Sequence, residues 1–271
     1  MPELPEVETV CRGISPHTVG QVITNVVVRD RRLRWPIPEG LETTLQGLSI
    51  NRIERRAKYL LLHFDASYLI IHLGMSGRLY LVKTGTAPEK HAHLDIDLNS
   101  GQSLRFTDPR RFGCVLWQQG KETTHKLLAK LGPEPLGEEF NGDYLYQKSR
   151  KRQVPIKTFL MNNHIVVGVG NIYANEALFI AGIRPTKPAS KLSKAKAELL
   201  VSAIKQVLAK AIAQGGTTLK DFVGGDGKPG YFAQELEVYG RAGMPCNQCG
   251  KELIEIRMNN RSTVYCSLCQ S

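Results

Sequence analysis

Four cysteines near the C-terminus have the spacing of a metal site. Cys246 and Cys249 form one Cys-x-x-Cys pair, Cys266 and Cys269 form a second, and sixteen residues separate the pairs. Each pair brings two thiolates toward one point, and two pairs complete the tetrahedral sulfur coordination that zinc favours. Because protein ligands fill all four positions, we expect one structural Zn²⁺. Clustering of four of the six cysteines also favours metal over disulfides in a reducing compartment.

The N-terminus, MPELPEVETV, places a proline and a carboxylate directly after Met1. If Met1 is removed, Pro2 presents a secondary amine as the chain terminus. An α-amino group with a pKa of about 7.7–8.0 is roughly one-third unprotonated near neutral pH, against about one-thousandth for an unperturbed lysine. The sequence therefore offers an amine nucleophile beside Glu3.

A nucleophile at a chain terminus needs an element that holds it in place. Pro5 suits the first turn of a helix, and Glu6 and Glu8 complement the helix dipole. We expect Glu8 to act only as a dipole partner, whereas Glu6 has contact with a substrate as a second option. The expected buried stripe is Leu4, Val7, Val10, Cys11 and Ile14.

The first 120 residues otherwise read as strands. Short apolar or alternating segments are separated by turn residues, and their close spacing indicates a β-sandwich or a barrel. The expected strands are Val22–Arg29, Tyr59–Phe64, Tyr68–His72, Arg78–Val82, His93–Leu98, Leu104–Thr107 and Cys114–Gln118.

From about residue 123 the pattern becomes helical. Lys191–Gln214 has apolar residues at helical spacing, and Gly215-Gly216 gives that helix a stop. The residues between the cysteine pairs alternate like two strands around a turn at Asn259-Asn260, which predicts a zinc ribbon or β-hairpin finger. The other expected helices are His125–Leu131, Asn141–Lys151 and Asn171–Ala181.

The composition indicates a polyanionic partner. The 271-residue chain has 36 Lys and Arg against 25 Asp and Glu, a net charge of +11, which favours nucleic acid or an acidic membrane surface. The longest apolar runs are too short to span a bilayer, and the acidic N-terminus does not resemble a secretory signal. A cytoplasmic protein is therefore expected.

Motifs along the whole chain carry a family resemblance. In order, they are MPELPEVET, RRAKYLL (55–61), HLGMSG (72–77), EKHAH (89–93), TDPRRFG (107–113), VGVGNIYANE (167–176), QGGTTLKDF (214–222) and the four-cysteine finger. With these motifs the sequence closely resembles the bacterial formamidopyrimidine-DNA glycosylases, base-excision enzymes for 8-oxoguanine and ring-opened purines. The related endonuclease VIII branch, which prefers oxidised pyrimidines, begins PEGPE and differs in its wedge residues. Arg152 stands where the family often has lysine, which preserves charge but not geometry.

The resemblance implies an α+β fold of three domains. A β-sandwich with an N-terminal helix would cover residues 1–120, a helix-two-turn-helix domain 121–230, and a zinc-finger β-hairpin 231–271. Thr217–Tyr231 would be the lesion-recognition loop, and DNA would bind between the domains. The implied enzyme is a monomer in the bacterial cytoplasm, associated with the nucleoid. It would excise oxidised purines from double-stranded DNA and cleave abasic sites by β,δ-elimination.

The resemblance assigns catalytic roles to four residues. Pro2 would attack the sugar C1′ and form an iminium, and Glu3 would be the general acid that assists sugar opening and base departure. Lys58 would contact phosphate and donate a proton in β-elimination. Arg261, at the hairpin tip, would do so in δ-elimination and clamp a phosphate.

Seven further residues would contact DNA. Met75, Arg110 and Phe112 resemble the family's three wedge residues, which fill the space left by an everted nucleotide. Asn171 follows Gly168-Val169-Gly170 at a helix start, where backbone amides can bind phosphate. The remaining expected phosphate contacts are His91, Arg152 and Lys157.

Two other classes of protein share part of this pattern. A non-catalytic zinc-finger DNA-binding protein would have the same basic charge and cysteines, and only Pro2, Glu3, Lys58 and Arg261 distinguish the enzyme from it. A ribosome-associated RNA-binding ribbon would explain the finger but not the first 120 residues.

Overall fold

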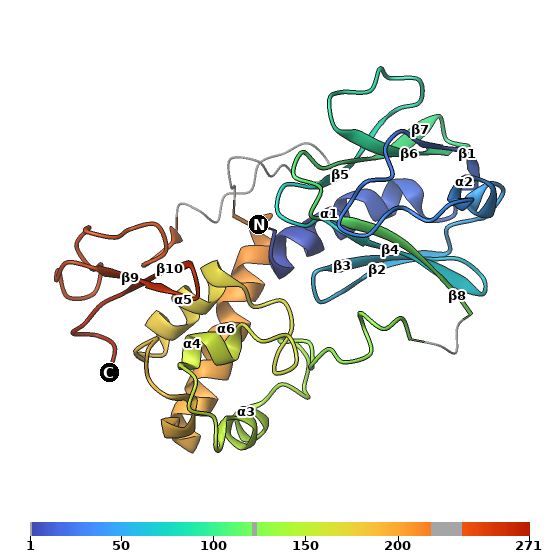
Figure 1. The fold of residues 1–271 in the computed structure, drawn as a ribbon. Helices are drawn as coiled ribbons and strands as arrows, with labels where there is room; N and C mark the ends of the chain where they lie inside the picture. Colours follow the sequence, from blue (N-terminus) through green and yellow to red (C-terminus); the bar gives the residue numbers. More distant parts are fainter. Residues whose placement is uncertain (1, 121–123, 218–234) are drawn as a thin grey trace. The chain divides into compact units, whose positions relative to one another are not determined.

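The computed structural model describes residues 2–120, 124–217 and 235–271. The chain forms two compact units (Figure 1). Unit 1 comprises Met1–Ala129 and Gln214–Tyr231, and unit 2 comprises Lys130–Ala213 and Phe232–Ser271. Among the described residues, no helix is long and apolar enough to cross a membrane.

Unit 1 contains two four-stranded sheets, ordered β1-β6-β7-β5 and β2-β3-β4-β8, in which all neighbouring strands are antiparallel. All seven expected strands are present, which confirms the N-terminal sandwich of an α+β fold. β2 was not predicted: its sequence, RIERR, is charged because it forms a partly exposed edge of its sheet. The strands are β1 (Ile23–Val28), β2 (Arg52–Arg56), β3 (Tyr59–His63), β4 (Ser67–His72), β5 (Arg78–Lys83), β6 (Ala92–Leu98), β7 (Gln102–Thr107) and β8 (Cys114–Gln119).

The first helix, α1 (Leu4–Thr18), is anchored in the core of unit 1. Every residue of its predicted stripe is buried, and one continuous apolar cluster joins the helix to both sheets. α1 contacts β2 and β3 of one sheet and β5 of the other. The chain terminus is therefore attached to a rigid element. A short unpredicted helix, α2 (Leu41–Leu45), precedes β2.

Unit 2 is built from helices and the C-terminal hairpin. Three predicted helices correspond to α3 (Gly142–Ser149), α5 (Asn171–Ile180) and α6 (Lys194–Ala213). The prediction of a helix over His125–Leu131 was wrong, because residues 126–130 form turns in which Leu128 N and Ala129 N both donate to the carbonyl of His125. Leu128 N donates to the carbonyl three residues back, so the segment closes a turn and does not continue into the i−4 hydrogen-bond pattern of an α-helix. Conversely, α4 (Ile156–Leu160) is a five-residue helix after Pro155 that was not predicted.

The hairpin confirms the predicted finger. β9 (Ile254–Met258) pairs antiparallel with β10 (Arg261–Tyr265). Asn259 and Asn260 form the two-residue turn with φ angles of 49° and 59°, a conformation that asparagine tolerates well. A small core beneath the finger contains Phe179 of α5 together with Val238, Cys246, Leu253, Val264 and Cys266. The finger therefore packs against α5 within unit 2.

Candidate active site

The N-terminal residues are fixed by the carboxylate of Glu6. Pro2 and Glu3 are buried and directly precede α1. Glu6 Oε2 accepts from Glu3 N at 2.8 Å in a reciprocal capping box, and Glu6 Oε1 accepts from Thr217 N at 2.9 Å. Because protein donors use both oxygens, the geometry favours a positioning role for Glu6. Of the expected lesion-recognition loop, residues 218–231 lie outside the described part of the chain.

Lys58 lies in the two-residue turn between β2 and β3, and it is half-buried. Arg55 Nε ties this hairpin to α1 through an ion pair with Glu8 Oε2 at 2.8 Å. Burial by itself raises the pKa of the Glu8 carboxyl, but hydrogen bonds from Arg12 and Arg55 outweigh it and hold that pKa below its usual value. Glu8 therefore does more than complement the helix dipole, and the expectation that it acts only as a dipole partner was too narrow.

His72 precedes the turn that carries Met75, and sequence reasoning gave it no role. Its Nδ1 accepts from Gly74 N at 2.9 Å, which requires an unprotonated nitrogen. Burial lowers the pKa of His72 to about 4, and the charges of Lys58 and Arg34 act in the same direction. The imidazole is therefore neutral at physiological pH and supports the turn. Only its place in the HLGMSG motif could have singled it out.

The three expected wedge residues lie on two turns of unit 1. Met75 is 38% exposed and Phe112 is 44% exposed, so both apolar side chains are accessible from solvent. The guanidinium of Arg110 lies 5.0 Å from the centroid of the Phe112 ring. His91 joins the same region, because its carbonyl accepts from Asp108 N at 3.1 Å. The structure thus brings these four residues into one part of unit 1.

In unit 2, Arg152, which we expected at phosphate, is exposed, as is its neighbour Lys151. Lys148 and Arg150 instead lie over the rings of Tyr144 and Tyr146. Asn171 is the first residue of α5, after the N-cap Gly170. Its buried Oδ1 has no hydrogen-bond partner among the described residues.

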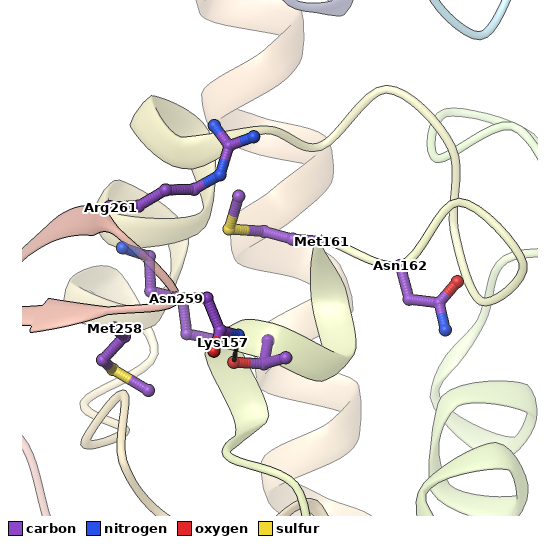
Figure 2. Close-up of a pocket in the computed structure, with 7 residues that line it drawn as sticks. Lys157, Met161, Asn162, Met258, Asn259 and Arg261 are labelled. Carbon is purple, nitrogen blue, oxygen red and sulfur yellow. Dashed lines mark hydrogen bonds between the residues drawn. The ribbon is translucent and has the colours of Figure 1, made fainter.

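Arg261 borders a pocket of ≈ 220 Å³ between α4 and the hairpin (Figure 2). Asn259 Nδ2, also at this pocket, donates to Thr158 Oγ1 at 3.2 Å. Arg261 is exposed, and no described carboxylate lies within ion-pair distance of its guanidinium. The pocket is lined by Lys157, Thr158, Met161, Asn162, Met258, Asn259 and Arg261.

Lys157 lies buried in α4. Its side chain is 1% exposed, and its ammonium donates to Ser262 O at 2.8 Å and to Thr263 Oγ1 at 2.7 Å. Lys157 therefore ties α4 to the strand that begins at Arg261, and it also borders the pocket beside that arginine. Its phosphate contact stays a prediction.

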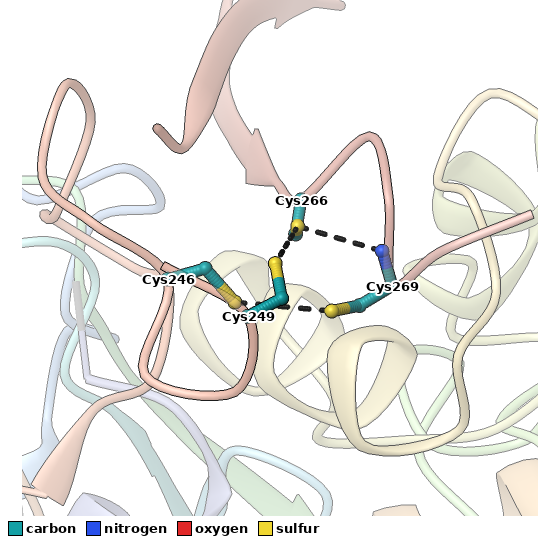
Figure 3. Close-up of side chains that lie close together, drawn as sticks. All are labelled: Cys246, Cys249, Cys266 and Cys269. Carbon is teal, nitrogen blue, oxygen red and sulfur yellow. Dashed lines mark hydrogen bonds between the residues drawn. The ribbon is translucent and has the colours of Figure 1, made fainter. Parts of the chain in front are cut away.

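The four C-terminal cysteines converge on one point (Figure 3). All four sulfurs lie within 4.8 Å of one another, with Cys246 and Cys269 at 3.9 Å and Cys249 and Cys266 at 3.5 Å. Ligands about 2.3 Å from a tetrahedral zinc ion would be about 3.8 Å apart, so the cluster fits that ion. Cys269 N donates to Cys266 Sγ at 3.4 Å, as expected for a sulfur that carries thiolate charge.

Glu176 is a further buried carboxylate that sequence reasoning missed. It accepts from the backbone N–H groups of Glu237, Val238 and Tyr239 at 2.8, 3.0 and 2.8 Å. Burial raises the pKa of Glu176, although these three donors oppose the shift. The carboxylate thus hydrogen-bonds residues 237–239, just before the first cysteine pair, to α5. Its partners are about 60 residues away, so only its place at the end of the VGVGNIYANE motif could have singled it out.

Three family models match the chain. "Formamidopyrimidine-DNA glycosylase N-terminal domain" matches residues 1–115, "Formamidopyrimidine-DNA glycosylase H2TH domain" matches 131–223, and "Zinc finger found in FPG and IleRS" matches 243–271.

Individual relatives match over their full length. The chain is 60% identical to the formamidopyrimidine-DNA glycosylase of Stutzerimonas stutzeri (strain A1501), with 100% of both chains covered. A Lactococcus lactis FPG variant in complex with Fapy-dG-containing DNA superposes with a TM-score of 0.93 at 35% identity, covering 99% of each chain. The Lactococcus lactis Fpg in complex with abasic-site DNA gives a TM-score of 0.92 at 35% identity and the same coverage. The chain therefore belongs to the formamidopyrimidine-DNA glycosylase family.

Proposed function

We propose that the protein removes 8-oxoguanine and formamidopyrimidines from duplex DNA and then cleaves the abasic strand as a lyase. The observation that carries this proposal is the Pro2-Glu3 terminus, buried and fixed at the start of α1. The family and the DNA complexes of the Lactococcus lactis relative support it. We place the enzyme in the cytoplasm, at the nucleoid, and divide it functionally at residues 1–120, 121–230 and 231–271.

Base release begins with eversion of the damaged nucleotide. Met75 and Phe112 would replace lost base stacking, and Arg110 would hydrogen-bond the orphaned cytosine. The Pro2 amine then attacks the sugar C1′, Glu3 supplies the proton that opens the sugar, and the base leaves. The product is an iminium between Pro2 and C1′.

Strand cleavage follows from the iminium charge. The cation acidifies the C2′ proton, whose loss expels the 3′ phosphate, and a second elimination expels the 5′ phosphate. Lys58 would supply the proton in the first elimination and Arg261 in the second. His91, Arg152 and Asn171 would hold phosphates. The zinc ion takes no part in these steps, because the four cysteines fill its coordination sphere.

The proposal is tested by incubating the purified protein with duplexes that contain 8-oxoguanine, an oxidised pyrimidine or no lesion. We expect strand cleavage at 8-oxoguanine and little at undamaged DNA. Preferential cleavage of the pyrimidine duplex would assign the chain to the endonuclease VIII branch. Tight binding without cleavage of any duplex would favour a non-catalytic DNA-binding protein.

Wedge variants should separate eversion from chemistry. Phe112→Ala should slow excision from a lesion duplex about 5- to 150-fold, since base–aromatic stacking is worth about 1–3 kcal/mol. Met75→Ala should slow excision in the same direction, because it removes the apolar side chain that would fill the space of the everted nucleotide. Cleavage of a preformed abasic site should change much less, because a nucleotide without its base is everted more easily. The comparison uses single-turnover rates on both substrates. Equal losses would mean that these side chains only maintain the fold.

Binding should depend steeply on salt. If Lys58, Arg152 and Arg261 each neutralise one phosphate, the slope of log K against log [salt] should be about −2.7. Affinity should then fall roughly 40-fold between about 50 and about 200 mM salt. Titrations of lesion-free DNA should show a substantial slope too. A nearly flat dependence would contradict the phosphate contacts.

A further inference from the structure

One buried carboxylate connects the two turns that carry the proposed wedge residues. Asp108 is 0% exposed. Its Oδ1 accepts from Ser76 Oγ at 2.8 Å and from Arg110 N at 3.3 Å, and its Oδ2 accepts from Gly113 N at 2.7 Å. Ser76 belongs to the Met75 turn, whereas Arg110 and Gly113 belong to the Phe112 turn. A single side chain therefore bonds both turns.

The backbone of Asp108 is fixed as well. Its N–H donates to His91 O at 3.1 Å, and its carbonyl accepts from His93 Nε2 at 2.9 Å. His93 is itself buried and lies near the start of β6. The backbone of Asp108 is therefore fixed to β6, and its carboxylate holds both turns in place relative to that strand.

The two turns also touch through their backbones. A Cβ added at Gly74 would lie 2.4 Å from Gly113 N, and one added at Gly113 would lie 2.6 Å from His72 O. Gly74 has a φ of +65°, a conformation that glycine adopts without strain. The backbones of the two turns are therefore in close contact, and the hydrogen bonds of Asp108 hold them in that contact.

We propose that Asp108 is a positioning residue that makes the two turns one rigid body. Met75 on one turn and Arg110 and Phe112 on the other would then enter the duplex together. The inference rests on the proposed wedge role of these three side chains. A side chain with two acceptor oxygens suits this position because three donors converge on it, two of them backbone N–H groups.

The test is Asp108→Asn, which keeps the shape but offers only one acceptor oxygen. An NH₂ group would face either Gly113 N–H or the Ser76 hydroxyl. We expect single-turnover excision from a lesion duplex to slow about 10- to 100-fold, with cleavage of a preformed abasic duplex within about 3-fold of the parent. Fluorescence of 2-aminopurine placed beside the lesion should show a correspondingly slower unstacking step.

Asp95→Asn is the matched control. Asp95 is another buried carboxylate of unit 1, bonded to Arg29 and Arg105 and not to the wedge turns. It should lower the melting temperature without the selective loss of excision. If Asp108→Asn slows both reactions equally, or if Asp95→Asn shows the same selective loss, the positioning role is overturned. If Phe112→Ala and Met75→Ala show no selective loss either, the wedge role has failed, which separates the two hypotheses.

Discussion

Borohydride added during turnover is expected to trap a covalent protein–DNA adduct whose crosslink maps to Pro2. The reason is the terminal amine, which is partly unprotonated near neutral pH and forms an iminium that hydride reduces. α1 holds this terminus against the core of unit 1, so attack geometry is available without ordering a free chain end. Peptide mapping by mass spectrometry after nuclease digestion identifies the crosslinked residue.

Retention of Met1, or extension of the chain ahead of it, should abolish trapping. A peptide nitrogen cannot act as the nucleophile, while the proposed phosphate contacts of Arg152, Asn171 and Arg261 remain available for binding. An equal extension after Ser271, which is exposed, is the matched control and should trap normally. A crosslink that mapped to Lys58 would show that Pro2 is only a helix-start residue.

Glu3→Gln divides the same reaction into its two steps. It should slow base release by about 10²–10⁴-fold, the usual contribution of a positioned general acid. Cleavage and trapping at a preformed abasic site should be affected much less, because no base has to leave. The buried Glu3 backbone still donates to Glu6 in this variant, so the helix start is retained.

Removal of zinc is expected to cause the second large effect, loss of tight DNA binding. Metal analysis should find one zinc per chain, and binding of a structural zinc ion contributes an apparent free energy of about 10–16 kcal/mol. Without it, the four cysteines take up protons and no longer link the two Cys-x-x-Cys turns, which leaves only the small core of the finger to hold the hairpin. Hydrogen exchange should therefore rise across β9 and β10, which carry Arg261.

Cys266→Ser should reproduce the effect of a chelator, because it removes a buried ligand. The matched control is Cys11→Ser, a buried cysteine of unit 1 that belongs to the apolar core and should leave zinc content unchanged. Hydrogen exchange should also rise in α5, since Phe179 of that helix packs into the core of the finger. Active protein that contained no zinc would contradict this account.

Sequence patterns predicted elements whose signal is local. Strands with alternating apolar residues, the amphipathic α1 and α6, and the cysteine hairpin were all expected from their own residues. β2 was missed because its position at the edge of the sheet lets charged residues take the place of an apolar pattern. The helix predicted at His125–Leu131 was wrong because its hydrogen bonds close only a turn.

The candidate site shows the same limit. The family resemblance named Lys157 as a phosphate contact, but the sequence does not show that its ammonium lies buried against Ser262 and Thr263. Asp108 and Glu176 were missed because their hydrogen-bond partners come from other turns and strands. The family resemblance named the residues proposed for chemistry, whereas the residues that hold them in place could be recognised only from the structure.

The bond between Glu6 and Thr217 has a consequence for synthesis on the ribosome. Its two partners are 211 residues apart in the chain. At a translation rate of about 5–20 residues per second, roughly 10–40 s pass between the emergence of the first residue and the second. During that interval the nascent N-terminus lacks the hydrogen bond from Thr217 to Glu6. The surroundings of the proposed nucleophile are therefore completed late in the synthesis of the chain.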